Sequence, residues 1–237
     1  MAKPVVRRLL RAVGLLEMAR SIKRGFHPAF MPAKPQLLMA VHRSLRWSAQ
    51  RNLLEGSDYL EFGIYRGFTL WYAQVIARDF GIQDMRFFGF DSFAGLPPVR
   101  GIDRKGSFET GDFYCSRKDV ETFLSEQKTD WSRTFLVEGW FEKTLTPQMR
   151  DRHALRRCSL CVIDCDLYES AHQVLKFIEP NIGDQTIVLF DDWFDFGNDP
   201  TKGEQKAFSE FLQRNPHIRP EPLTNPDYDG QGFILRI

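Results

Sequence analysis

Two short apolar runs that end in aspartates constrain the fold of this chain most strongly. Residues 158–163 and 187–190 are almost wholly apolar, and Asp164 and Asp191 follow them directly. Apolar runs of this length are typical of strands that are buried on both faces of a parallel sheet. Aspartate is disfavoured in strands and is rarely buried without a partner. We therefore expect these acids at the carboxyl edge of the sheet, where open α/β folds bind their ligands.

The rest of the chain alternates between predicted strands and predicted helices. The strands are predicted at 58–62, 85–90, 134–137, 158–163 and 186–190, and the helices at 68–80, 120–127, 145–153, 169–178 and 204–214. Two further strands at 217–222 and 232–237 flank turn-forming residues and indicate an antiparallel hairpin at one edge. This order predicts an α/β fold with a doubly wound, mostly parallel sheet. Residues 92–118 lack a clear period, and so long a connection is usually functional or mobile.

The first 55 residues are expected to form a separate helical segment, 1–55, followed by a catalytic domain, 56–237. Residues 1–27 combine an apolar stripe with a strongly basic face, prolines interrupt 28–35, and 36–55 again have a helical pattern. We favour a basic helix that packs on its own domain or on a partner subunit, which makes a homodimer plausible. A weak contact with a membrane surface and an organelle-targeting role are the alternatives.

Composition and cysteine content narrow the class of protein. A net charge of +1 gives no general attraction to nucleic acid, and we expect neither a secretory signal nor a membrane span. Cys158 and Cys161 form a CxxC pair. Residues three apart on a strand should point to opposite faces, and no second pair completes a metal site. We therefore expect buried, reduced thiols in a cytoplasmic protein.

A glycine motif separates the first predicted strand from its helix. It has the pattern E-x-G-x-x-x-G, with Glu61, Gly63 and Gly67, and Asp91 closes the next strand. Gly63 suits a tight turn, Gly67 suits close packing of helix and strand, and Asp91 suits the two hydroxyls of a ribose. Tyr65 stands where a dinucleotide site has its middle glycine and would obstruct a pyrophosphate. The motif favours a nucleoside ligand without pyrophosphate, such as S-adenosylmethionine. The alternatives are an NAD-linked oxidoreductase and a non-catalytic binding module on a methyltransferase scaffold.

Taken together, these pieces resemble the macrocin O-methyltransferase family, a class I group that uses S-adenosylmethionine. The matching segments are colinear and stand at 59–67, 88–97, 139–145, 163–170 and 190–193. The resemblance implies a seven-stranded sheet and a divalent cation, Mg²⁺, held by Asp164, Asp191 and Asp192. It also implies that Glu61 and Asp91 touch the cofactor and that 139–141 borders the adenine.

These arguments give one set of predicted site residues and one predicted function. The cofactor-binding residues are Glu61, Gly63, Tyr65, Arg66, Gly67, Asp91, Ser92, Gly139, Trp140 and Asp164. The metal ligands are Asp164, Asp191 and Asp192, with Asp164 also catalytic, because clustered carboxylates repel unless a hard cation joins them. Helix capping is the alternative, favoured only for Asp166. We expect an O-methyltransferase that acts on a hydroxyl of a small molecule such as a sugar or polyol.

Overall fold

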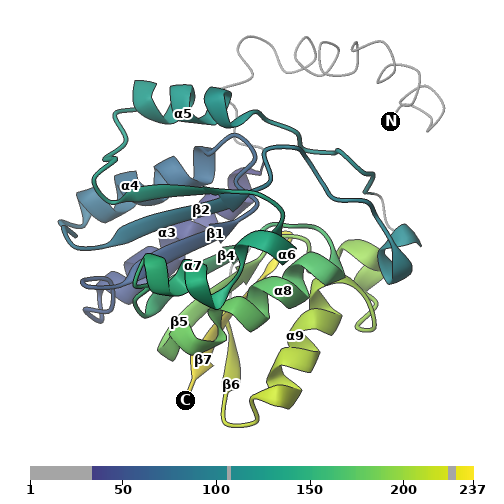
Figure 1. Cartoon of the computed structure of the whole chain (residues 1–237). Helices are drawn as coiled ribbons and strands as arrows, with labels where there is room; N and C mark the ends of the chain where they lie inside the picture. The colour runs from purple at the N-terminus through teal and green to yellow at the C-terminus, as the bar shows by residue number, and fades with distance from the viewer. Residues whose placement is uncertain (1–33, 106–107, 224–227) are drawn as a thin grey trace. The chain divides into compact units, whose positions relative to one another are not determined.

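The computed structural model describes residues 34–105, 108–223 and 228–237, and its centre is a seven-stranded sheet (Figure 1). The strand order is β3-β2-β1-β4-β5-β7-β6. The strands are β1 (Asp58–Phe62), β2 (Arg86–Asp91), β3 (Thr134–Glu138), β4 (Cys158–Ile163), β5 (Ile182–Phe190), β6 (Arg219–Leu223) and β7 (Gln231–Arg236). The strands β1 to β5 pair in parallel, whereas β7 runs antiparallel to β5 and β6. The predicted doubly wound, mostly parallel sheet with an antiparallel edge is confirmed.

The helices agree with the predicted alternation, with two differences at their ends. They are α3 (Pro35–Ala49), α4 (Phe68–Asp79), α5 (Arg117–Glu126), α6 (Phe141–Thr144), α7 (Pro147–Arg152), α8 (Tyr168–Ile178) and α9 (Gly203–Arg214), with short 3₁₀ turns η2 (Gly101–Lys105), η3 (Glu179–Asn181) and η4 (Asp195–Asn198). The helix predicted at 145–153 corresponds to α7, which begins two residues later than predicted, after the separate short helix α6. Leu145 leaves the helical conformation, and α7 begins afresh at Pro147, with the Thr146 hydroxyl accepting from Met149 N–H. The helix predicted at 36–55 ends earlier, at Ala49.

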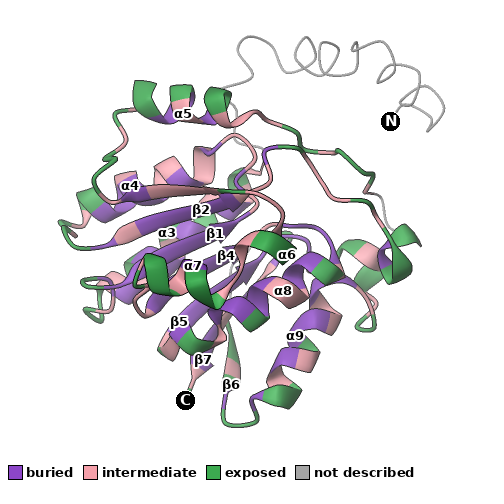
Figure 2. Ribbon diagram, viewed as in Figure 1, coloured by how far each residue is buried: buried purple, intermediate pink, exposed green. Residues whose placement is uncertain are grey.

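Helices cover both faces of the sheet, so the central strands are buried (Figure 2). On one face α3 packs against α4, β4 and β5, while α4 contacts β2. On the other face α8 contacts α6, α9 and β4. Aromatic rings fill much of the space on the α8 side, where Phe62 and Phe90 stack with their ring centres 4.5 Å apart and Phe177 meets both rings at an angle. This packing holds the strand ends in fixed positions.

Helix α3 belongs to the same compact unit as the sheet, which extends from Lys34 to Ile237. Its buried side includes Leu37, Val41 and Leu45, and none of these side chains is more than 3% exposed. Among the described residues, α3 therefore packs with the sheet, and the predicted domain boundary at residue 55 stays a prediction. The basic helix predicted at 1–27 lies outside the described residues. Among those that are described, no helix has the length and apolar character that crossing a membrane requires.

The CxxC pair shows where strand periodicity misled the sequence analysis. The pairing of β4 with β5 shifts register between Cys158 and Leu160, which marks a β-bulge. The extra residue turns Cys158 to the same face as Cys161, and both side chains belong to one buried apolar cluster. The prediction that they point to opposite faces is wrong. Both thiols are free and fully buried.

Candidate active site

The residues that follow the parallel strands form one row along the carboxyl edge of the sheet. Each donates its backbone N–H to a carbonyl oxygen at the end of the neighbouring strand: Gly63 to Phe90 (2.9 Å), Gly139 to Asp91 (2.9 Å), Asp164 to Phe62 (2.9 Å) and Asp191 to Ile163 (3.0 Å). These bonds extend the sheet ladder by one residue and fix the relative height of the four segments. The glycine motif and the aspartates therefore share one edge, as the sequence predicts.

Gly63 allows the glycine loop to approach the first aspartate. Its φ is +86°, and a Cβ at this position would lie 1.8 Å from the carbonyl oxygen of Asp164. Only glycine tolerates both the left-handed backbone and this contact. The turn after β1 is thus pressed directly against the turn after β4.

Asp91 organises the glycine loop from the end of β2. One carboxylate oxygen accepts the backbone N–H groups of Ile64 (2.9 Å) and Tyr65 (3.0 Å), and the other accepts that of Phe93 (2.7 Å). Burial raises the pKa of Asp91, although these three N–H bonds oppose the shift. The side chain was predicted to meet a ribose. Most of the hydrogen-bond acceptor positions of its carboxylate are already occupied by N–H groups of the loop, and few remain for a ligand.

Glu61 is buried beneath the same loop. Its carboxylate accepts a hydrogen bond of 2.5 Å from the Tyr59 hydroxyl, and its exposure is 2%. Burial raises the pKa of Glu61 to about 8. The negative charge of nearby Asp91 adds to this rise, whereas the hydrogen bond from Tyr59 opposes it. At neutral pH the side chain is therefore largely protonated and can donate as well as accept a hydrogen bond.

The other predicted cofactor residues surround these two acids. Tyr65 has a left-handed φ of 49°, and its ring meets that of Phe113 edge-on. Gly67 caps α4 and packs against Val120 of α5, not against a strand as predicted. Arg66 stacks its guanidinium over the Tyr65 ring, Ser92 bonds within its own turn, and Trp140 is the N-cap of α6 after Gly139. Their contact with a cofactor stays a prediction.

Three aspartates converge where β4 and β5 end. One carboxylate oxygen from each of Asp164, Asp191 and Asp192 lies within 4.8 Å of the others. Asp191 and Asp192 are nearly inaccessible, whereas Asp164 is half-buried. Oδ1 of Asp191 and Oδ2 of Asp192 accept no hydrogen bond from any described residue. Oxygen ligands with free lone pairs at this spacing suit a hard divalent cation.

The electrostatics of this cluster also favour a cation. Burial raises the pKa of Asp191 to about 6 and that of Asp164 well above its ordinary value, and neighbouring carboxylates raise both further. The ammonium of Lys34 lies 2.5 Å from Asp191 Oδ2 and 3.0 Å from Asp192 Oδ1. Burial alone would lower the pKa of Lys34, but the aspartates raise it strongly. The ammonium of Lys34 thus supplies a positive charge to the aspartate cluster.

Two more buried acids adjoin the cluster. Asp166 was predicted to cap α8, but it makes no such bond; the N-cap is Leu167, which uses no side-chain bond, and Asp166 is buried with φ of 64° near Asp192. Glu204, in the first turn of α9, accepts the backbone N–H of Asp192 at 3.1 Å and is 1% exposed. Glu204 therefore holds the turn that carries two of the aspartates.

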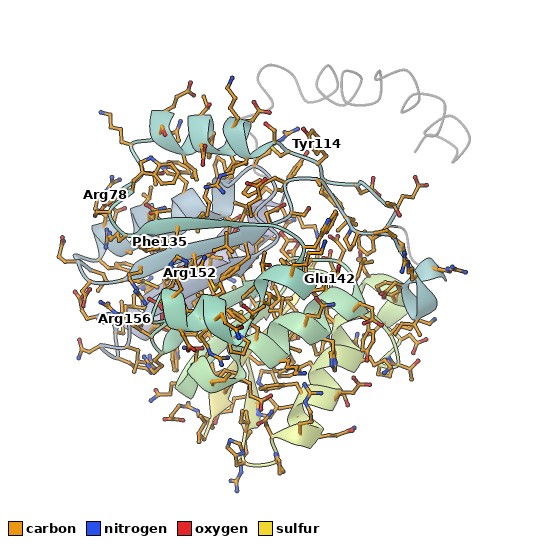
Figure 3. The ribbon with its side chains drawn as sticks, viewed as in Figure 1. Arg78, Tyr114, Phe135, Glu142, Arg152 and Arg156 are labelled. Carbon is orange, nitrogen blue, oxygen red and sulfur yellow. The ribbon has the colours of Figure 1, made fainter. Side chains whose placement is uncertain are left out.

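The start of α8 is capped from a distant part of the chain. Asp103, in η2 of the long connection after β2, is 1% exposed and accepts the backbone N–H of Tyr168 at 3.0 Å. Phe108, farther along the same connection, meets the ring of Phe196 beyond the aspartates. Figure 3 places Tyr114, also on this connection, and Glu142 of α6 toward the edge where the strands end, whereas Arg78 and Arg156 lie where they begin. The connection thus belongs to the site end of the sheet.

Sequence reasoning missed Lys34, Asp103 and Glu204. Lys34 follows a proline-rich stretch, Asp103 lies in an irregular connection, and Glu204 occupies a helical turn where glutamate is common. None belongs to a motif, so no local signal marks them. Each reaches the site only through the tertiary fold.

Comparison with known proteins adds independent evidence. A sequence model described as macrocin-O-methyltransferase (TylF) matches residues 36–233. Mycinamicin III 3''-O-methyltransferase of Micromonospora griseorubida is 27% identical over 154 residues, which cover 62% of this chain and 58% of that protein. A Streptomyces olivaceus enzyme, 8-demethyl-8-(2,3-dimethoxy-alpha-L-rhamnosyl)-tetracenomycin-C 4'-O-methyltransferase, is 26% identical over 159 residues, covering 63% and 59%. The chain thus spans less than two thirds of the length of these relatives.

A solved structure supports the fold. The crystal structure of CalS11, calicheamicin methyltransferase, superimposes with a TM-score of 0.71 and 21% identity, covering 99% of this chain and 94% of that one. At this level of identity the similarity establishes the architecture.

Proposed function

This chain belongs to the macrocin O-methyltransferase family, and we propose that it transfers the methyl group of S-adenosylmethionine to a hydroxyl group of a sugar-bearing small molecule. One observation carries the proposal: the glycine loop after β1 and the aspartate cluster meet at Gly63 and the carbonyl of Asp164. A methyl donor held by the loop would lie beside an acceptor held by the aspartates. Proximity of this kind supplies much of the acceleration of a displacement reaction.

The donor side is built from backbone groups and two buried acids. Asp91 fixes the N–H groups of the loop, and the largely protonated Glu61 lies beneath it. S-adenosylmethionine supplies an electrophilic methyl group on a positively charged sulfur. The site offers this cofactor carboxyl, backbone and aromatic groups, and it lacks the glycine-rich phosphate cradle that a pyrophosphate would need. This favours methyl transfer over an NAD-linked oxidation.

Three observations suggest that the acceptor side can hold a divalent cation. They are the spacing of the three aspartates, the carboxylate oxygens that accept no hydrogen bond, and the ammonium of Lys34 beside them. Mg²⁺ held by Asp164, Asp191 and Asp192 would polarise an acceptor hydroxyl and make it more acidic. Glu204 would keep the Asp191–Asp192 turn in place through the backbone of Asp192.

We assign Asp164 as the general base, which accepts the proton of the acceptor hydroxyl. The residue is partly exposed, and its backbone adjoins the glycine loop. In the reaction the hydroxyl oxygen attacks the methyl carbon, the carbon–sulfur bond breaks, and the hydroxyl proton passes to the Asp164 carboxylate. The products are a methyl ether and S-adenosylhomocysteine. Burial and the neighbouring acids raise the pKa of Asp164 when no cation is bound, and a bound cation would lower it, so that the carboxylate would be ionised and able to accept the proton.

The relatives narrow the acceptor. The tetracenomycin enzyme is named for 4'-O-methylation of a substrate with a rhamnosyl group, and the Micromonospora enzyme is named for 3''-O-methylation of mycinamicin III. We propose a free hydroxyl on a deoxysugar as the acceptor class.

The test uses S-adenosylmethionine with an isotopically labelled methyl group, MgCl₂, and a panel of rhamnosylated and other glycosylated small molecules. We expect a labelled methyl ether on a sugar oxygen, detected by mass spectrometry. The Asp164→Asn variant should still bind S-adenosylhomocysteine but transfer the methyl group at least about 100-fold more slowly. Absence of any calorimetric heat with S-adenosylhomocysteine, or methylation of nitrogen in place of oxygen, would refute the proposal.

A further inference from the structure

Lys34 supports an inference that rests on the metal half of the proposed function. The residue immediately precedes α3 and lies 158 positions before Asp192, yet its ammonium contacts both buried aspartates that follow β5. The side chains of Asp191 and Asp192 are 1% and 2% exposed, whereas that of Lys34 is 41% exposed. The lysine therefore enters the cluster from the solvent side.

The contact places a positive charge where the cluster needs one. Asp164, Asp191 and Asp192 lie within 4.8 Å of one another, and Glu204 adds a further buried acid at the backbone of Asp192. Carboxylates this close repel strongly in a poorly solvated site. An ammonium at 2.5 Å and 3.0 Å from two of them relieves that repulsion.

We propose that Lys34 is a built-in counter-ion of the aspartate cluster, which a divalent cation displaces when it binds. Lys34 and the cation would need the same oxygens, Asp191 Oδ2 and Asp192 Oδ1, and could not share them without placing like charges a few ångströms apart. The lysine has a flexible stem and a partly exposed side chain, so it can move into solvent. Because each cation must first break this ion pair, Lys34 lowers the affinity of the site.

The exchange also links the site to α3. Pro35 begins that helix directly after Lys34, and no side chain caps its first turn. When the ammonium leaves the aspartates, the start of α3 loses its tie to the end of β5. Binding of a cation to the aspartate cluster would therefore change the contacts at the start of α3.

Calorimetric titration with MgCl₂ and MnCl₂, without cofactor or acceptor, tests the affinity. We expect the Lys34→Met variant to bind both ions about tenfold more tightly than the unaltered protein, and Lys34→Arg to stay near the unaltered value because it keeps the charge. Lys206→Met is the matched control, since Lys206 pairs with Glu210 and its side chain is 30% exposed. That control should leave the affinity unchanged.

Chemical labelling tests the displacement itself. An amine-acetylating reagent, followed by peptide mass spectrometry, should modify Lys34 several-fold faster when MgCl₂ is present, whereas Lys206 should react at the same rate with and without the ion. Equal metal affinity in Lys34→Met and the unaltered protein, or unchanged Lys34 labelling, would overturn the counter-ion role and leave the metal site intact. Failure of either ion to bind any of the variants would overturn both the counter-ion role and the metal half of the proposed function.

Discussion

At the scale of single residues, Gly63 decides whether the two halves of the site can meet. We expect Gly63→Ala to lower the free energy of unfolding by about 3 kcal/mol or more, because the new Cβ would lie 1.8 Å from a backbone oxygen and strain the left-handed φ. Urea denaturation measures this loss. It should be accompanied by loss of S-adenosylhomocysteine binding.

Gly81→Ala is the matched control for that substitution. Gly81 has a φ of +75°, and a Cβ there would meet nothing within 4 Å. The cost should be only about 1 kcal/mol, the penalty of the left-handed backbone alone. Similar losses in the two variants would mean that the contact with Asp164 is unimportant.

Glu61 gives the site a pH dependence with a definite sign. Its pKa is 4.5 before folding and about 8 in the folded chain, so folding takes up a proton between these values. The free energy of unfolding therefore falls as the pH rises through this window. Glu61→Gln, which binds no proton, should lose less stability between pH 5 and pH 8 than the unaltered protein. Urea denaturation at both pH values measures the difference, and the exposed Glu142→Gln should behave like the unaltered protein.

Asp91 holds the glycine loop in shape, and its removal should weaken cofactor binding through that loop. Asp91→Ala leaves the N–H groups of Ile64, Tyr65 and Phe93 without their acceptor, so the loop loses its shape. We expect the affinity for S-adenosylhomocysteine to weaken by about 1–3 kcal/mol, measured by calorimetry. Asp130→Ala removes another turn aspartate, which accepts the N–H of Ser132, and should leave that affinity unchanged. An unaltered affinity in Asp91→Ala would place the cofactor elsewhere.

At the scale of elements, the long connection after β2 and helix α8 depend on each other. Helix α8 has no cap from its own N-cap residue, and Asp103 of η2 supplies one. A helix that follows Asp164 so closely transmits the position of its first turn to that aspartate. Under the proposed function, the connection would therefore help to position Asp164.

Asp103→Ala should expose this dependence. We expect a loss of about 1 kcal/mol in the free energy of unfolding, together with faster tryptic cleavage after the exposed Arg104 and reduced turnover. Thr146→Ala removes the cap of α7 and should cost similar stability without affecting proteolysis at Arg104. If the two variants show the same turnover, Asp103 merely stabilises the fold.

At the scale of the whole molecule, we expect the acids at the end of the sheet to make the stability of the folded chain depend on divalent ions. A ligand that binds only the folded state raises the melting temperature as its concentration increases. We expect MgCl₂ to raise the melting temperature more than NaCl of equal ionic strength, and Asp191→Asn to abolish the difference. Scanning calorimetry provides the measurement. Equal shifts with both salts would indicate simple screening.

The sequence by itself determined the fold class and the sheet edge that the glycine motif and the aspartates share. Apolar strands that end in Asp164 and Asp191, and a glycine motif after 58–62, follow from local periodicity and turn chemistry, which neighbouring residues largely dictate. Tertiary structure alone decided the rest. The bulge that turned Cys158 toward Cys161, the cap from Asp103 and the arrival of Lys34 at the aspartates all join residues that no local pattern connects. Such contacts are fixed by how the packed elements bring distant segments together, and the free energy that selects them belongs to the folded whole.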